Sequence, residues 1–419
     1  MQWSSRAMLR LLTENTLDRE ERIMAEWLKT ALIDIVELIG GGTPKTSKAE
    51  YWGGNINWLS VKDFNNENRY VYSTEKTITE EGLNNSSTKL LKKDDIIISA
   101  RGTVGELAMI PFPMAFNQSC YGIRAKEGID SIFLYYLIKN SVRKLKAITH
   151  GSVFDTITRD TFANIEVAIP DIKTQHRIAK MLADIDDKVE NNQRINNNLE
   201  QQIEAVLLSF IENTNSNDVK LGDYLYIKGR IGWKGLKKEE YLEHSDYRII
   251  NGESLTKAGI DWSKAGYISQ ARYDESPEIM LQSGDILLSK DGTIGKIGYI
   301  DSLATPTTVA SGIFVIRNLQ PNIISTTFIY YLLKSRLFTT FIAARTEGSV
   351  IPHLYQKDFM QFEFPLPDKE EMANFEELTA PMFSLIVSNL NENDRLMRIR
   401  DSLLPRLMSG ELDVSDIDL

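Results

Sequence analysis

The stretch "DDIIISARGTVGELAMI" at residues 94–110 returns without a gap as "GDILLSKDGTIGKIGYI" at residues 284–300. Three further blocks recur in the same order: "FLYYLIK" at 133–139 and "FIYYLLK" at 328–334, "GSV" at 151–153 and at 348–350, "IPD" at 169–171 and "LPD" at 366–368. The offset grows from 190 through 195 to 197, as short loop insertions produce. Because this period is far longer than the roughly 20–50 residues of a solenoid repeat, each half is a domain with an appended segment.

The repeated blocks also indicate the fold of each half. The apolar runs "IIIS" and "ILLS" lead into Gly-Thr-Val-Gly or Gly-Thr-Ile-Gly, which predicts a strand, a tight turn and a second short strand. The "YYL" blocks have helical spacing, whereas "FANIEVAIP" and "FMQFEFPLP" alternate and stop at proline, as a closing strand does. The sequence therefore predicts an α+β fold with two mixed α/β domains in pseudo-twofold repeat.

A long helix follows each domain. From Ile172 to about Glu212 there is neither glycine nor proline, and apolar residues recur at steps of three and four, which is typical of a coiled-coil seam. The predicted seam consists of Leu182, Ile185, Val189, Asn192, Asn196, Leu199, Ile203, Val206 and Phe210, and in the second half of Met382, Ile386, Asn389, Asn393, Leu396, Leu403 and Leu407. Such a helix is about 60 Å long.

Two asparagines interrupt each seam at equivalent positions, although Arg400 stands where the first half has Ile203. If the two helices pair antiparallel, the asparagines of one meet those of the other, and a buried amide then fixes the register. The alternative is that Asn192, Asn196, Asn389 and Asn393 lie on a solvated edge. If they are buried, replacing Asn196 and Asn393 together by leucine is expected to raise the thermal stability.

These patterns predict the following division of the chain. Its segments are an N-terminal extension over 1–23, a first domain over 24–171, a first long helix over 172–212, a linker over 213–219, a second domain over 220–370, a second long helix over 371–413 and an acidic tail over 414–419. The extension has no counterpart in the second half, so it reads equally as an upstream start assigned in error or as a short amphipathic helix.

Composition narrows the class of protein. The 419 residues are 42% hydrophobic and 25% charged, which supplies ample core for two domains. The single cysteine, Cys120, excludes an internal disulfide and fits a reducing cytoplasm, and no apolar run approaches the ~20 residues that span a bilayer. We therefore expect a soluble cytoplasmic protein without membrane contact. A net charge of −10 argues against a general DNA coat but not against a reader of specific sites.

The sequence offers no reaction centre. The glycine-rich stretch Gly40–Ser47 lacks the spacing of a phosphate-binding loop, and Pro44 has no N–H for a phosphate. The four histidines show no metal-ligand spacing, and Cys120 precedes an alternating strand as a core residue does. We therefore expect a non-catalytic binding protein; an enzyme that uses the Gly40–Ser47 loop as a nucleotide site is the alternative.

The motifs resemble a known family. "GGGTPKTSKAEYWGGNINWLSVKDF", followed by "ISARGTVGELAMI", "GSV", "IPD" and a long helix, looks like a target-recognition domain, and "RDSLLPRLMSGELDV" is similar to the C-terminal signature of type I restriction-modification specificity subunits. The resemblance covers about residues 24–414. It implies a reader of bipartite double-stranded DNA whose helices form an antiparallel coiled coil that sets the spacer and docks two modification subunits.

The resemblance also places the chemistry on other chains. The modification subunits would bind S-adenosylmethionine and methylate adenine, and restriction subunits would use ATP and Mg²⁺ for translocation. This chain would then bind no cofactor itself. An orphan or exchange subunit, which assembles with the partners of another system, fits the same residues.

Polar residues in or beside the predicted turns are the candidate DNA contacts, because arginine suits guanine, asparagine and glutamine suit adenine, and lysine suits phosphate. In the first domain these are Thr43, Lys45, Thr46, Lys48, Arg101, Asn117 and Gln118. In the second domain they are Arg230, Trp233, Lys234, Lys237, Lys238, Lys290 and Ser349. No metal ligands are predicted.

Overall fold

The computed structural model describes residues 27–64, 68–149, 156–214, 217–230, 235–257, 259–346 and 353–414. The predicted N-terminal extension and both Gly-Ser-Val motifs lie outside the described residues. The chain forms two compact units: residues 1–191 with 395–419 make unit 1, and residues 192–394 make unit 2. Both long helices therefore contribute to both units.

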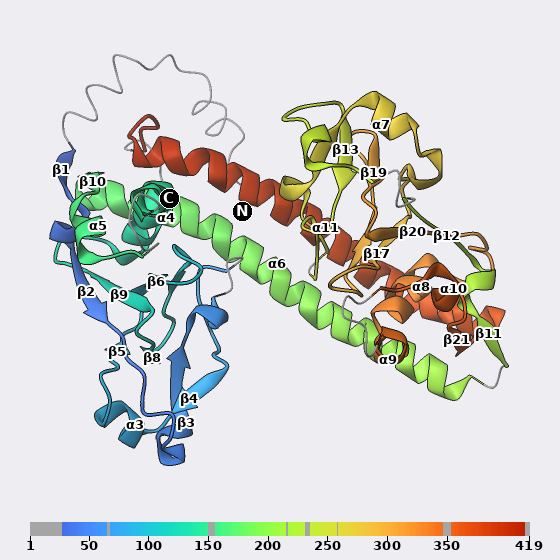
Figure 1. Cartoon of the computed structure of the whole chain (residues 1–419), viewed down its shortest axis with the longest axis horizontal. Coiled ribbons are helices and arrows are strands. Elements are labelled where there is room, and N and C mark those ends of the chain that lie inside the picture. Colours follow the sequence, from blue (N-terminus) through green and yellow to red (C-terminus); the bar gives the residue numbers. More distant parts are fainter. Residues whose placement is uncertain are drawn as a thin grey trace. The chain divides into compact units, whose positions relative to one another are not determined.

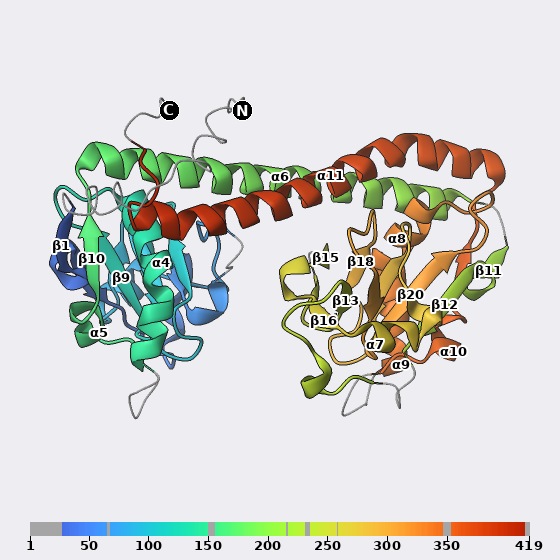
Figure 2. The same cartoon turned by 90° about the horizontal axis from the view of Figure 1, so that it is seen from above.

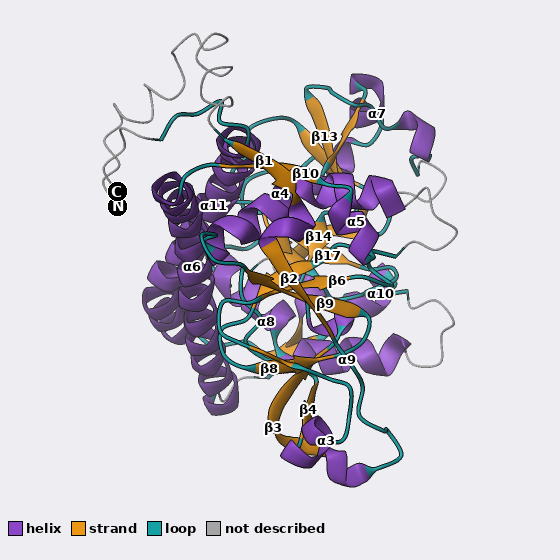
Figure 3. Ribbon diagram, turned by 90° about the vertical axis from the view of Figure 1, so that its left-hand side faces the viewer, coloured by secondary structure: helices purple, strands orange, loops and turns teal. Residues whose placement is uncertain are grey.

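Unit 1 is built on two four-stranded sheets (Figures 1 and 3). The first has the order β2 (Val36–Gly40), β9 (Cys120–Ala125), β6 (Ile96–Ser99), β7 (Leu107–Met109), and all its pairs are antiparallel. The second has the order β4 (Lys76–Ile78), β3 (Trp52–Leu59), β8 (Met114–Phe116), β5 (Leu90–Leu91), with β3 and β8 parallel. The remaining elements are β1 (Leu28–Ala31) paired with β10 (Glu166–Ile169), and the helices α3 (Glu80–Asn84), α4 (Ser131–Thr149) and α5 (Arg159–Ala163).

Unit 2 repeats the first sheet strand for strand. Its order is β12 (Leu225–Gly229), β20 (Ile313–Asn318), β17 (Ile286–Ser289), β18 (Ile297–Tyr299), again antiparallel throughout. The remaining strands are β16 (Gly266–Ile268), β13 (Tyr247–Ile250) and β19 (Thr307–Val309) in one sheet, β14 (Leu255–Thr256) with β15 (Gly259–Ile260), and β11 (Asp218–Lys220) with β21 (Glu363–Pro365). Its shorter helices are α7 (Gln270–Asp274), α8 (Thr326–Lys334), α9 (Arg336–Thr346) and α10 (Gln356–Phe359).

The repeat extends to individual hydrogen bonds. The hydroxyl of Ser99 accepts the N–H of Glu106 at 2.8 Å, and that of Ser289 accepts the N–H of Lys296 at the same distance, which closes the Gly-Thr-x-Gly turn in both units. A buried carboxylate beside the sheet is held by arginine in each unit, Asp95 by Arg124 and Asp285 by Arg317. Two mixed α/β domains in repeat are thus confirmed.

The helix α6 spans Ile172–Asn213, close to the predicted 172–212. The helix α11 spans Lys369–Met408 and ends five residues before the predicted 413. The reason is Gly410, whose φ of 74° is left-handed and stops the helix, while the N–H of Leu412 turns back to the carbonyl of Arg406 at 3.2 Å. Leu412 is thereby buried in the core of unit 1. Among the described residues, no helix is both long and apolar enough to cross a bilayer.

The two long helices lie side by side in each unit, and they run antiparallel (Figure 2). Leu182 of α6 and Leu407 of α11 are fully buried in the core of unit 1, whereas Ile203 and Ile386 lie in the core of unit 2. In each unit, apolar seam residues of the two helices therefore lie in the same core as residues of one domain.

Candidate nucleic-acid interface

The glycine-rich loop after β2 packs closely against the backbone that follows β8. A Cβ on Gly41 would lie 2.1 Å from the carbonyl oxygen of Asn117, and the N–H of Gly42 donates to the carbonyl of Phe116 at 3.0 Å. The indole N–H of Trp58 donates to the carbonyl of Gly42 at 3.0 Å. The glycines thus let the loop lie against the end of β8, and the N–H of Gly42 is already used.

Three turns of unit 1 meet here: the glycine-rich loop after β2, the turn between β8 and β9, and the turn after β6. The hydroxyl of Thr43 donates to the side-chain oxygen of Gln118. The carbonyl of Ser119, one residue further, accepts the N–H of Ala100 at 2.8 Å and that of Arg101 at 3.2 Å. The structure therefore brings four predicted residues together: Thr43, Arg101, Asn117 and Gln118.

The three other candidates of unit 1 lie on the same glycine-rich loop. Lys45 and Thr46 are exposed at its turn, and Lys48 is half-buried. The ammonium of Lys48 donates to the hydroxyl of Tyr51 at 3.0 Å, and this hydrogen bond is the main cause that raises the pKa of Lys48. The loop thus exposes the ammonium of Lys45 and the hydroxyl residues Thr46 and Ser47 beside Arg101's turn, a set suited to phosphate contacts.

The equivalent turn of unit 2 carries different side chains. The N–H of Lys290 donates to the carbonyl of Gly312 at 2.9 Å, and the Lys290 carbonyl accepts the N–H of Leu354 at 2.9 Å. Its ammonium lies 5.2 Å from the ring centroid of Phe314. Asp291 occupies the position of Arg101 and bonds to Nδ1 of His353. The two units therefore share the turn but not its chemistry.

The structure contradicts the prediction that Arg230 contacts DNA. Its side chain is only 2% exposed, and its guanidinium donates to the carbonyl of Val309 at 3.1 Å and approaches the hydroxyls of Ser276 and Thr308, at 3.5 Å each. A guanidinium that stabilises the loop from inside has no surface for DNA. Lys237 and Lys238 are exposed, whereas Trp233, Lys234 and Ser349 lie outside the described residues.

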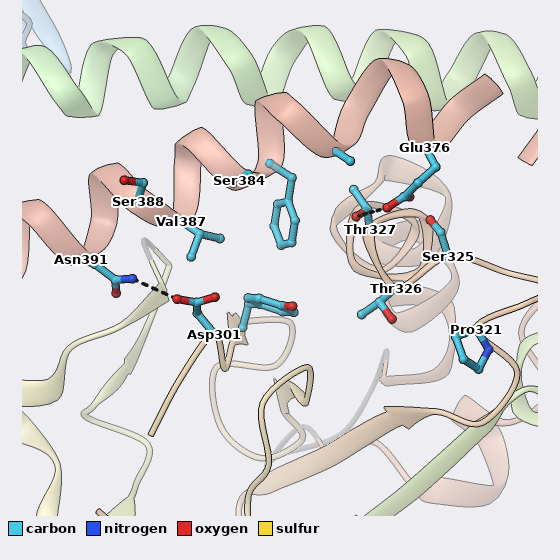
Figure 4. Close-up of a pocket in the computed structure, with 13 residues that line it drawn as sticks. Asp301, Pro321, Ser325, Thr326, Thr327, Glu376, Ser384, Val387, Ser388 and Asn391 are labelled. Carbon is cyan, nitrogen blue, oxygen red and sulfur yellow. Dashed lines mark hydrogen bonds between the residues drawn. The ribbon is translucent and has the colours of Figure 1, made fainter. Parts of the chain in front are cut away.

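A cavity in unit 2 has the wrong charge for a nucleic acid. It has a volume of about 630 Å³ and lies where α11 faces β18 and the start of α8 (Figure 4). Among the described residues, its lining includes the carboxylates of Asp301 and Glu376 and no lysine or arginine. The side-chain amide of Asn391 donates to Asp301 at 3.2 Å, and one oxygen of Glu376 is buried without a hydrogen bond. Phosphate would be repelled here.

Catalytic and metal chemistry find little support among the described residues. They contain no group of three or more His, Cys, Asp or Glu side chains placed to hold a metal ion. Burial raises the pKa of the Cys120 thiol to about 12, so the thiolate needed for nucleophilic attack is absent at neutral pH.

The four seam asparagines meet in unit 2. The side-chain amide of Asn192 donates to Oδ1 of Asn393 at 2.9 Å, and that of Asn389 donates to Oδ1 of Asn196 at 2.8 Å. All four side chains are buried. The sequence-based double substitution of Asn196 and Asn393 therefore falls on two different pairs, and it would leave half of each pair in place.

Replacing the matched pair Asn196 and Asn389 together by leucine is expected to raise stability by about 1–2 kcal/mol, because two amides are exchanged for apolar side chains in a seam. The single change Asn389→Leu is expected to lower it by about 1–3 kcal/mol, since Oδ1 of Asn196 then stays buried without a donor. Hydrogen exchange in the unit 2 part of α6 measures both. A double variant no more stable than the single one would contradict the assignment.

Sequence reasoning missed a charged network in unit 1. Asp186 accepts hydrogen bonds from Nη1 of Arg400 at 2.7 Å and from the hydroxyl of Tyr136 at 2.6 Å. Arg69 approaches the same hydroxyl at 3.4 Å and pairs with Asp187 at 2.6 Å. The signal in the sequence was Arg400, a charged residue that stands in the second seam where the first has Ile203.

Comparison with known proteins assigns this fold. The family model described as "Type I restriction modification DNA specificity domain" matches twice, at residues 24–201 and 213–380. The chain belongs to this family. The type I restriction enzyme MjaIX specificity subunit of Methanocaldococcus jannaschii is 29% identical, over 94% of this chain and 96% of its own.

Two further relatives agree with this assignment. The Escherichia coli EcoR124I/EcoR124II specificity subunit is 33% identical over 38% of this chain and 41% of its own. The crystal structure of a type I restriction-modification S subunit from M. genitalium superposes with a TM-score of 0.56, at 19% identity, over 91% of this chain and 96% of that one. This last likeness concerns the fold alone.

Proposed function

We propose that this chain is the DNA sequence-specificity subunit of a type I restriction-modification complex. Each unit would read one half of a bipartite site in double-stranded DNA, and the paired helices would set the unread spacer between the halves. The observation that carries the proposal is the duplication itself: two copies of one recognition domain stand in a single chain, with different side chains on the same turn, Arg101 in one and Asp291 in the other. Two half-sites of different sequence need such a reader.

The catalytic steps would belong to partner chains. Two modification subunits would dock on the helices and methylate adenine with S-adenosylmethionine, and restriction subunits would supply ATP- and Mg²⁺-dependent translocation. This chain would contribute binding and geometry only, within the cytoplasm. Its family membership supports the assembly.

A methylome tests this function directly. The chain is expressed with the modification gene beside it in a host free of DNA methylation, and modified adenines are mapped by single-molecule sequencing. A two-part motif with a fixed gap is expected. A soluble, assembled complex that leaves the genome unmodified would contradict the proposal and favour an inactive or exchange subunit.

Within this assay, Arg101→Ala is expected to weaken recognition of one half-site by about 1–3 kcal/mol and to leave the other half-site unchanged. Lys93→Ala is the matched control. Lys93 is also exposed, but it precedes β6, whereas Arg101 follows that strand, so the two side chains leave opposite ends of it. An equal effect of both variants, or a change in both half-sites, would exclude Arg101 as a base contact.

A further inference from the structure

The asparagine pairs of the seam are symmetric under the repeat. The offset of 197 relates Asn192 to Asn389 and Asn196 to Asn393. Because the hydrogen bonds join Asn192 to Asn393 and Asn196 to Asn389, exchanging the two repeats converts one pair into the other. A helix α6 paired with a second copy of α6 would therefore keep the bonds between asparagines, although Ile195 would stand in place of Glu392, which accepts from Asn192 at 2.8 Å. The bonds between asparagines specify an antiparallel register, but they do not specify the partner.

The buried ion pair of unit 1 breaks this symmetry. Nη1 of Arg400 lies 2.7 Å from Oδ1 of Asp186, and the two side chains are 11% and 7% exposed. The same offset relates Asp186 to Phe383 and Arg400 to Ile203. Both counterparts lie in the apolar core of unit 2. Equivalent positions of the two helices thus hold a charged pair in unit 1, Asp186 with Arg400, and two apolar residues in unit 2, Ile203 and Phe383.

We infer that the Asp186–Arg400 pair selects α11 as the partner of α6 and excludes a second copy of α6 from that place. In a pair of two α6 helices, Ile203 would replace Arg400, and Asp186 would keep only the hydroxyl of Tyr136 as its hydrogen-bond donor. In a pair of two α11 helices, Arg400 would face Phe383. Each wrong pair contains two such sites. Asp186 would keep the nearby charge of Lys139, and Arg400 would keep its contact with Asp401 at 2.8 Å, but each would lose its buried partner on the facing helix, which is destabilising.

The selection matters during synthesis, when α6 is made before α11. The N-terminal half leaves the ribosome first, so α6 is available for pairing before α11 exists. At that stage another α6 is the competing partner, and it offers the same apolar residues and the same asparagines. The discriminating residue therefore has to lie in α6 itself, as Asp186 does. This inference rests on the chain's own residues and stands whether or not the proposed function is correct.

The test begins with the full chain and a protease site inserted between Asn213 and Asp218. After folding, the chain is cut, the halves are left to exchange, and native mass spectrometry counts mixed and like pairs. In the wild type, the ratio of mixed to like pairs is expected to exceed the ratio of a random mixture by about tenfold or more. The variant Asp186→Phe with Arg400→Ile, in which each residue becomes its repeat counterpart, is expected to approach the random mixture.

Two further variants make the result decisive. Replacing all four seam asparagines by leucine removes both hydrogen-bonded pairs and changes the two repeats equally, so the excess of mixed pairs is expected to persist. Arg400→Ile alone serves if the double variant does not fold, and it is expected to increase pairs of two C-terminal halves, because no arginine then faces Phe383. A wild type that already exchanges at random, or a charge-free variant that keeps the wild-type excess, would overturn the inference.

Discussion

Replacing Arg400 by leucine is expected to lower the free energy of unfolding of unit 1 by about 3–5 kcal/mol. Leucine fits the seam by size, but it leaves the carboxylate of Asp186 buried without its ion-pair partner on α11, with the hydroxyl of Tyr136 as its hydrogen-bond donor and the charge of Lys139 nearby. The loss of a charge partner in a dry interface outweighs the gain from apolar burial. Hydrogen exchange of α4 and of residues 172–191 reports the change within unit 1.

The matched control is Arg395→Leu on the same helix. Arg395 is exposed, so the change is expected to stay within about 0.5 kcal/mol. If both variants destabilise unit 1 equally, the effect belongs to the helix and not to the ion pair. If neither does, the pair contributes nothing to stability.

The pH dependence of the Arg400 effect has a defined sign. Burial alone would raise the pKa of Asp186, but Lys139, Arg400 and Tyr136 outweigh it, and the pKa lies below its ordinary value of 3.8. A carboxyl whose pKa is lowered on folding stabilises the protein above its unfolded pKa and loses that contribution as the pH falls through the folded value. The difference between wild type and Arg400→Leu is therefore expected to shrink below about pH 4. A difference unchanged between pH 7 and pH 3 would contradict this account.

The sequence predicts the framework well because local patterns determine it. The recurrence of residues 94–110 at 284–300 predicts the repeated sheet, and a seam free of glycine and proline predicts both helices. The end of α11 was predicted too late, although Gly410 carried the signal: only glycine adopts a left-handed φ there without strain.

The sequence patterns could not predict which of the polar side chains are buried. Arg230 directly follows β12 and reads as an exposed basic residue, but its guanidinium turns inward to carbonyl and hydroxyl oxygens from residues 276–309. Such partners are distant in sequence and carry no periodicity. The same holds for Arg69, which reaches Tyr136 and Asp187 from a different part of unit 1. Loops whose order depends on long-range polar contacts escape pattern analysis.

Inserting four residues into each long helix is expected to lengthen the spacer of the recognised DNA by one or two base pairs and to leave both half-sites unchanged. Four residues add about 6 Å to a helix, and a base pair rises about 3.4 Å. The insertions belong after Asn197 in α6 and after Val387 in α11, because Asn196 is paired with Asn389 and the seam runs antiparallel. Placed there, both helices lengthen at the same level.

The one-sided insertion is the informative comparison. Four residues after Asn197 alone would move Ile203 and Leu207 relative to Phe383 and Ile386, all four of which belong to the core of unit 2. That variant is expected to lose stability in unit 2, whereas the two-sided variant keeps these contacts and changes only the length. If the two-sided variant methylates an altered half-site with an unchanged spacer, the helices do not measure the DNA. A longer spacer with both half-sites intact would mean that helix length, and not the recognition domains, sets the gap.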